Sequence, residues 1–137
     1  KGGGAAHTRE KILHAASKAF YCLVDESKRV SVLGERTAIP VEVLPMARQV
    51  VESKLRELGA LQVDMRLARM KDGPVITDNG NLILDARFQL TDPPAMEAIL
   101  ARIPGVVENG IFALPHCNLA GIFVGQSDGA IFLKKEL

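Results

Sequence analysis

Apolar residues near the start of the chain follow two different spacings. Over residues 5–19 they recur at helical intervals, whereas residues 20–25 form a short run of β-forming side chains. The positions that define the helical spacing are Ile12, Leu13, Ala16, Ala19 and Phe20. A loop, a helix and a strand in this order form half of a parallel α/β unit, and such a strand needs neighbours on both sides. The pattern therefore predicts an α/β fold with a parallel sheet.

The next segment predicts a strand, a helix and a second strand. Residues 39–44 suit a strand, Pro45 suits the first turn of a helix, and Gly59 suits its end. Residues 61–68 then alternate between apolar and polar side chains, as a strand with one covered face does. We expect buried positions at Met46, Val50, Val51, Leu55 and Leu58 in the helix, and at Leu61, Val63, Met65 and Leu67 in the strand.

A second strand, helix and strand come after two turns. The turns fall at residues 71–74 and 78–80, and strands are predicted over residues 81–88 and 106–113. The helix between them has Thr91 or Asp92 as its cap and Pro93 or Pro94 in its first turn. It ends at Pro104-Gly105, and the side chains expected to face inward are Ile99, Leu100 and Ile103. The resulting order, β-α-β-β-α-β, is the split ferredoxin-like pattern, and this part is long enough to close a core of its own.

Composition excludes several classes of protein. With 47% hydrophobic and 24% charged residues, the chain is not intrinsically disordered. A net charge of +1 and only 4% aromatic residues argue against a nucleic-acid partner. No apolar run is long enough for a membrane span, and the first residues are no signal peptide. We expect a cytoplasmic protein with neither a nucleic-acid nor a membrane partner.

The cysteines and histidines do not form a metal-binding pattern. Cys22 and Cys117 lack the spacing of a metal site or a redox pair, so both are expected to be free thiols. Cys22 should lie in the core, and Cys117 follows His116 in a turn, where a reactive pair is a minor alternative. His7 and His14 could share one helix face, but with no third ligand they are better explained by packing or surface exposure.

The first ten residues combine three features of an anion site. Lys1 supplies a positive charge, Gly2, Gly3 and Gly4 leave backbone N–H groups uncovered, and a helix follows whose N-terminus attracts anions. Glu10 lies in the second turn of the predicted helix, within reach of whatever the loop holds. A cation and a carboxylate that face one small ligand suggest proton transfer. The alternative is a flexible connector followed by a solvated carboxylate.

The same stretch, KGGGAAHTREKI, closely resembles the signature KGGGAALTREK of type A ribose-5-phosphate isomerases, with His7 as its one departure. Further segments are similar to motifs of that family in the same order. They are VDESK at residues 24–28, which is similar to a strand end that carries a substrate-contacting lysine, PVEVLPMA at 40–47, TDNGN at 77–81, IPGVV at 103–107 and GIFA at 110–113. Six ordered matches make chance similarity improbable.

The resemblance implies an enzyme of pentose phosphate metabolism. It would interconvert ribose 5-phosphate and ribulose 5-phosphate through an enediolate, with no metal or organic cofactor. Glu10 would be the general base, and Lys1 would stabilise charge on the substrate oxygens. Gly2, Gly3 and Gly4 would contribute backbone contacts to the sugar phosphate, and Lys28 would also contact it.

The resemblance also implies a domain layout and an assembly. A Rossmann-like catalytic domain would contain residues 1–36 and 114–137, and a ferredoxin-like domain of residues 37–113 would be inserted in it. Strands predicted over residues 119–124 and 130–133, joined by a turn at 126–129, would return to the first domain. The family suggests a homodimer or a homotetramer.

One departure bears on activity. In the family, a TGST-like phosphate loop and a DGADE-like acidic loop precede the lysine, and neither occurs in this sequence. We therefore expect the 137 residues alone to hold part of an active site and to be inactive. Two alternatives stay open: a non-catalytic anion-binding or oligomerisation module built on the ferredoxin-like part, and an ACT-like regulatory domain. The sequence assigns no role to Asp25, and it favours a plain turn at residues 78–80.

Overall fold

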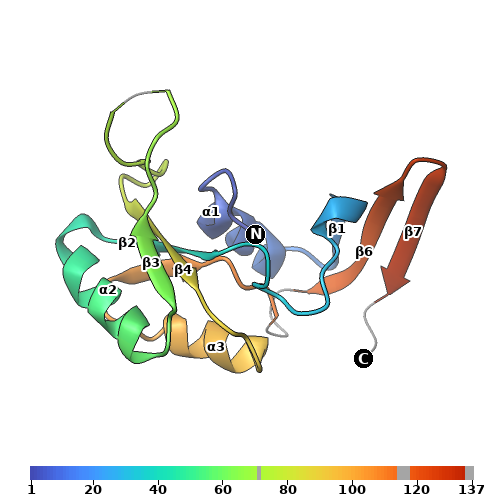
Figure 1. Ribbon diagram of the computed structural model, residues 1–137. Helices are drawn as coiled ribbons and strands as arrows, with labels where there is room; N and C mark the ends of the chain where they lie inside the picture. Colours follow the sequence, from blue (N-terminus) through green and yellow to red (C-terminus); the bar gives the residue numbers. More distant parts are fainter. Residues whose placement is uncertain (71, 114–117, 135–137) are drawn as a thin grey trace.

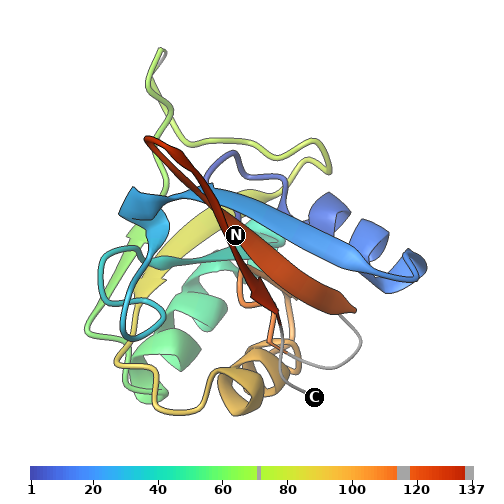
Figure 2. The same ribbon diagram turned by 90° about the vertical axis from the view of Figure 1, so that its right-hand side faces the viewer.

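Two β-sheets form the framework of the computed structural model, which describes residues 1–70, 72–113 and 118–134 (Figure 1). The smaller sheet has the strand order β1-β6-β7. Its strands are Phe20–Asp25 (β1), Leu119–Gln126 (β6) and Gly129–Lys134 (β7). β1 pairs with β6 in parallel, and β6 pairs with β7 antiparallel. The first and last strands of the chain therefore lie in one sheet, which faces the viewer in Figure 2.

The larger sheet is antiparallel throughout and has the order β3-β4-β2-β5. Its strands are Ile39–Val43 (β2), Gln62–Met65 (β3), Leu82–Arg87 (β4) and Val106–Asn109 (β5), and its helices are Arg48–Glu57 (α2) and Pro93–Leu100 (α3). The elements follow one another in the predicted order, and Asp92 caps α3 by accepting a hydrogen bond from the backbone N–H of Ala95. The mixed α/β class is confirmed.

The hydrophobic core lies between the larger sheet and the helices α2 and α3 (Figure 1). Its fully buried members include Val41 and Val43 of β2, Val51 and Leu55 of α2, and Leu100 of α3. Burial of such side chains is the main favourable term in folding. The smaller sheet is more exposed: Tyr21 and Leu23 on its edge strand β1 expose 49% and 76% of their surface.

Several positions predicted to be buried are exposed. A short 3-10 helix, Pro45–Ala47 (η2), precedes α2, and α2 then turns Val51 and Leu55 toward the sheet. Because β3 is only four residues long, the alternation predicted over residues 61–68 is not carried through. The predictions of burial were wrong for Met46, Val50, Leu61, Leu67 and Ile99, all of which are exposed. Within the described part of the chain, no helix has the length and hydrophobicity that crossing a membrane requires.

The first helix, His7–Ala16 (α1), buries the opposite face from the one expected. Its buried side chains are His7, Lys11 and His14, whereas Ile12 and Leu13 expose 64% and 59% of their surface. The three buried positions recur at helical spacing. The apolar spacing therefore misidentified the packed face, because the surface on which α1 packs carries carboxylates.

Lys11 is the centre of this polar contact. Its Nζ lies 2.9 Å from a carboxylate oxygen of Glu97 in α3 and 2.8 Å from one of Glu108 in β5, and its side chain exposes only 5% of its surface. The same ammonium group lies 4.9 Å from the ring centre of Phe112. A buried charge is tolerated only when it is paired and hydrogen-bonded. These contacts therefore fix the position of α1 along β5 and α3.

A second buried carboxylate, that of Glu42 in β2, joins α1 to the segment before β4. One of its oxygens accepts hydrogen bonds from Thr77 at 2.8 Å, Asn79 at 3.0 Å and Asn81 at 2.9 Å, and the other accepts one from Thr8 in α1. Burial by itself raises the pKa of Glu42, but the four hydrogen bonds favour the ionised form, and the net effect is a pKa below the ordinary value of 4.5.

This arrangement predicts how stability depends on pH. Because the pKa of Glu42 is lower in the folded state, its contribution to stability is present above pH 4.5 and is lost as the pH falls through the folded-state pKa. Glu42→Gln should lower the free energy of unfolding by about 2–4 kcal/mol at neutral pH, since its amide offers N–H groups to hydrogen-bond donors. The difference from the unsubstituted protein should shrink in acid, as measured by urea unfolding at several pH values.

The matched control is Glu57→Gln, whose exposed carboxylate pairs with Lys54 on α2. Surface ion pairs of this kind contribute about 0–1 kcal/mol, so its unfolding curves should nearly match those of the unsubstituted protein. A Glu42→Gln deficit that stays constant from neutral to acid pH would contradict the role of the ionised carboxylate.

Two glycines with nearly equal φ values offer a test of packing. Gly59 and Gly105 have φ values of +91° and +92°, but a Cβ at Gly59 would meet nothing within 4 Å, whereas one at Gly105 would lie 2.2 Å from the Cβ of Ala47. Gly59→Ala should cost about 1–2 kcal/mol for the left-handed backbone alone. Gly105→Ala should cost roughly 2–5 kcal/mol because a clash is added. Equal shifts in the urea midpoint would contradict this packing.

Candidate active site

The glycine segment forms a tight turn in front of α1. The N–H of Ala5 donates to the carbonyl of Gly2 at 3.0 Å, and Ala5 itself has a φ of +60°. Because Ala5 has a left-handed conformation, α1 begins at His7 rather than at residue 5. Glu10 therefore lies in the first turn of the helix, not in the second turn as predicted. The N-cap residue, Ala6, provides no side-chain hydrogen bond to the start of the helix.

Close packing against the larger sheet holds the start of this turn. Gly2 has a φ of +105°, and a Cβ there would lie 2.5 Å from Cγ of Pro40 in β2. The backbone nitrogen of Lys1 donates to the carbonyl of Gly110 at 2.7 Å, and the N–H of Gly110 donates to the carbonyl of Pro40 at 2.8 Å. A side chain at Gly110 would collide with the carbonyl of Lys1. Gly3, in contrast, has open space where a side chain would stand.

Lys1 and Glu10 lie next to each other at the start of α1. The Nζ of Lys1 is 3.3 Å from Oε1 of Glu10, and the two side chains expose 29% and 37% of their surface. The other carboxylate oxygen of Glu10, Oε2, is buried and has no hydrogen-bond partner among the described residues. Buried oxygens without a partner are rare in folded proteins and call for an explanation. A half-buried carboxylate with one unpaired oxygen beside an ammonium group is suited to accept a proton.

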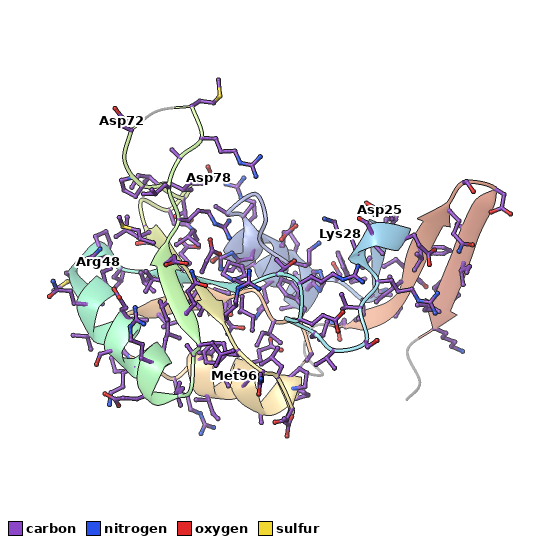
Figure 3. The ribbon with its side chains drawn as sticks, viewed as in Figure 1. Asp25, Lys28, Arg48, Asp72, Asp78 and Met96 are labelled. Atoms are coloured by element: carbon purple, nitrogen blue, oxygen red, sulfur yellow. The ribbon has the colours of Figure 1, made fainter. Side chains whose placement is uncertain are left out.

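Lys28 lies farther along the chain, at the end of β1. It closes the short 3-10 helix Glu26–Lys28 (η1), which Asp25 caps by accepting a hydrogen bond from the N–H of Ser27 at 2.8 Å. Hydrogen bonds from Ser27 lower the pKa of Asp25. Figure 3 shows Asp25 and Lys28 together at this end of the strand. Within the described residues, no hydrogen bond or ion pair joins Lys28 to Lys1 or Glu10.

Residues 78–80 form a turn, as predicted. The N–H of Gly80 donates to the carbonyl of Thr77 at 2.9 Å, and Asn79 and Asn81 bind Glu42. Asp78 is exposed, lies 3.3 Å from Arg9 and is labelled in Figure 3. Its position beside α1 gives this turn a second link to the helix that carries Glu10.

Among the described residues, the histidines and Cys22 belong to no group of side chains that could hold a metal ion. The Nε2 atom of His7 lies 3.3 Å from the carbonyl oxygen of Glu108, and burial lowers the pKa of His7 despite this hydrogen bond. His14 packs against the ring of Phe20. Cys22 is half-buried in β1, not in the core as predicted, while His116 and Cys117 lie outside the described residues. No group of three metal-ligating side chains occurs in residues 1–70, 72–113 and 118–134.

Sequence reasoning missed three charged residues that build the surroundings of the site: Lys11, Glu42 and Arg66. Glu42 could have been noticed, because it is a charged residue between Val41 and Val43 in an apolar strand. Arg66 was read only as a polar position of an alternating strand, yet its guanidinium contacts the carbonyls of Gly2 and Gly3. The partner of Lys11 in β5 lies 97 positions away in the sequence, and no local pattern indicates such a pair.

Comparison with known proteins gives one consistent result. The family model for ribose 5-phosphate isomerase A (phosphoriboisomerase A) matches residues 1–129. The chain is 56% identical over 136 residues to ribose-5-phosphate isomerase A of Methanothermobacter thermautotrophicus. This match covers 98% of this chain and 58% of that protein. The chain thus spans about half the length of the curated relatives it matches, between 53% and 58% for two of them.

Two solved structures agree with these matches. Ribose 5-phosphate isomerase A from Methanocaldococcus jannaschii superimposes with a TM-score of 0.91 and 47% identity, over 98% of this chain and 58% of that one. A D-ribose-5-phosphate isomerase in complex with phospho-erythronic acid has the same TM-score, 43% identity and the same two coverages. The order of motifs, the extent of the family match and the agreement in structure lead to one conclusion. This chain belongs to the ribose 5-phosphate isomerase A family.

Proposed function

We propose that this chain supplies the proton-transfer machinery of a ribose-5-phosphate isomerase, with Glu10 as its general base. The observation that carries the proposal is the pairing of Lys1 with Glu10, whose second carboxylate oxygen is buried and unpaired among the described residues. This pair lies next to a glycine turn, at the start of a helix whose N-cap residue, Ala6, provides no side-chain hydrogen bond. The family membership supplies the substrate class.

The proposed chemistry follows from the groups present. Aldose–ketose isomerisation moves a proton between two adjacent carbons through an enediolate. The free oxygen of Glu10 would take the proton from one carbon and return it to the other. The ammonium group of Lys1 would stabilise the negative charge that develops on the substrate oxygen, assisted by N–H groups of residues 2–4. No step requires a metal or an organic cofactor.

The complex of a relative with phospho-erythronic acid supports the ligand class. That ligand combines a phosphate with a short polyhydroxylated carboxylic acid, so it presents anionic oxygens at both ends. An ammonium group and exposed backbone N–H groups suit such a ligand. Phospho-erythronic acid is therefore a suitable probe of binding to this site, independent of turnover.

The domain layout is part of the proposal. The parallel pairing of β1 with β6 supports a Rossmann-like domain made from residues 1–36 and 114–137. The antiparallel order β3-β4-β2-β5, with both helices packed on the core, supports an inserted ferredoxin-like domain of residues 37–113. We further propose a homodimer or a homotetramer. The free thiol of Cys22 fits a cytoplasmic protein.

Glu10→Gln tests the general base in the complete protein. The amide keeps the size of the side chain but cannot accept the proton, so kcat for ribose 5-phosphate should fall by roughly 10²- to 10⁴-fold. The dissociation constant for phospho-erythronic acid, measured by calorimetry, should change much less. Near-normal kcat in this variant would contradict the assignment of Glu10.

The control for this experiment is Glu52→Gln, a partly exposed carboxylate that pairs with Arg56 on α2. Its kcat and KM should equal those of the unsubstituted protein. If the unsubstituted complete protein binds phospho-erythronic acid but does not convert ribose 5-phosphate, the non-catalytic anion-binding alternative is favoured instead.

Lys28→Met tests the proposed contact with the substrate. Methionine keeps most of the length of the side chain and removes its charge, so a lost charge-assisted hydrogen bond should raise KM by roughly tenfold or more. The value of kcat should fall far less, because Lys28 is not assigned to proton transfer. Lys18→Met, at an exposed position after α1, is the matched control. Equal KM values for the two variants would remove Lys28 from the site.

A further inference from the structure

Arg66 contacts the glycine turn from a position one residue after the strand β3 of the larger sheet. It follows β3, where its own N–H donates to the carbonyl of Ile83 at 2.9 Å and its carbonyl accepts from the N–H of Val75 at 2.9 Å. Only 18% of its side-chain surface is exposed. The backbone of Arg66 is therefore held by hydrogen bonds to neighbouring segments, and its guanidinium group is restrained by burial.

The guanidinium group joins a carboxylate of the sheet to the carbonyls of the turn. Its Nε and Nη2 donate to the two carboxylate oxygens of Asp85 in β4, at 2.8 and 2.5 Å. Its Nη1 donates to the carbonyl of Gly2 at 2.7 Å and to that of Gly3 at 3.2 Å. The fork of donors in arginine is rigid and planar, so the two-point contact with Asp85 fixes the direction in which Nη1 points.

The glycine turn needs such a restraint. A Cβ placed at Gly3 or Gly4 would meet nothing within 4 Å, so packing around side chains cannot hold these residues. Glycine also has the greatest backbone freedom of any residue. A contact with the backbone itself is the remaining way to hold the turn in one conformation.

We propose that Arg66 is a positioning residue that orients the peptide planes of the glycine turn. In a trans peptide the C=O of one residue and the N–H of the next point in opposite directions. Holding the carbonyls of Gly2 and Gly3 toward Arg66 therefore turns the N–H groups of Gly3 and Gly4 away from it. These two N–H groups are the donors offered to an anionic substrate oxygen, an assignment that rests on the function proposed above.

The surroundings of Arg66 make this role accessible to experiment. Together with Gly3, Gly4 and Asp85 it lines an open groove of about 820 Å³. Arg87 lines the same groove but is exposed, which makes it a matched control. A small cation from solution can enter an open groove of this size, so a guanidinium ion can take the place of a deleted arginine side chain.

The first test is chemical rescue in the complete protein. Arg66→Ala should lower kcat/KM for ribose 5-phosphate by roughly 10²-fold, the loss that misplacement of a site by about 1 Å causes. Guanidinium at millimolar, non-denaturing concentration should restore part of this activity, and ammonium should restore less. Arg66→Lys, which keeps charge and bulk but lacks the fork, should remain impaired. Arg87→Ala should keep full activity.

The second test measures the turn without any substrate. Nitrogen-15 relaxation should give order parameters near 0.85 for the N–H groups of Gly3 and Gly4 in the unsubstituted protein, and values falling toward 0.6 in Arg66→Ala and Arg66→Lys. Arg87→Ala should leave them unchanged. Unchanged order parameters in both Arg66 variants, or rescue by ammonium equal to that by guanidinium, would overturn the proposal. Absence of isomerase turnover in the unsubstituted protein would contradict the proposed function, and the order parameters would still decide the role of Arg66.

Discussion

The site depends on a buried polar contact between α1 and the larger sheet. Lys11 is enclosed by the carboxylates of Glu97 and Glu108, and Glu42 receives a hydrogen bond from Thr8 one turn earlier. Apolar packing tolerates sliding, because its energy depends mainly on area, whereas buried ion pairs and hydrogen bonds are lost when their geometry changes. The helix that carries Glu10 is therefore held in one register, at a cost in desolvation that the charge pairs offset.

The larger sheet has two chemically different faces, and the same strands build both. In β2, Val41 and Val43 enter the core while Glu42, between them, faces α1. In β4, Leu84 and Ala86 enter the core while Asp85 reaches Arg66. Because successive side chains of a strand point to opposite faces, the core sets the register of the carboxylates. A change in the core is thus transmitted to the site through strand position.

The sequence revealed the elements better than the contacts between them. The bounds of β1, the order of strands and helices, and a helix cap at Thr91 or Asp92 followed from local signals, and the structure has Asp92 as the cap. The packed face of α1 did not, because the groups that bury Lys11 belong to α3 and β5, remote in sequence. In the candidate site, the motif led directly to Lys1 and Glu10, which the structure brings together. Arg66 was missed because its carboxylate partner, Asp85, lies 19 positions away and its other partners are backbone carbonyls, which leave no trace in the residue pattern.

The parallel pairing of β1 with β6 also constrains how the chain folds. At the end of β6, Gln126 donates to Glu26, 100 positions earlier in the chain, so the pairing of β1 with β6 has a very high contact order. Joining strands so far apart in the sequence costs loop-closure entropy, and no short-range contact between β1 and β6 offsets that cost. When residues 39–109 are already folded, the connection becomes a compact body that brings both ends near each other (Figure 1). Folding of the segment between β1 and β6 therefore shortens the loop that the pairing of these two strands must close.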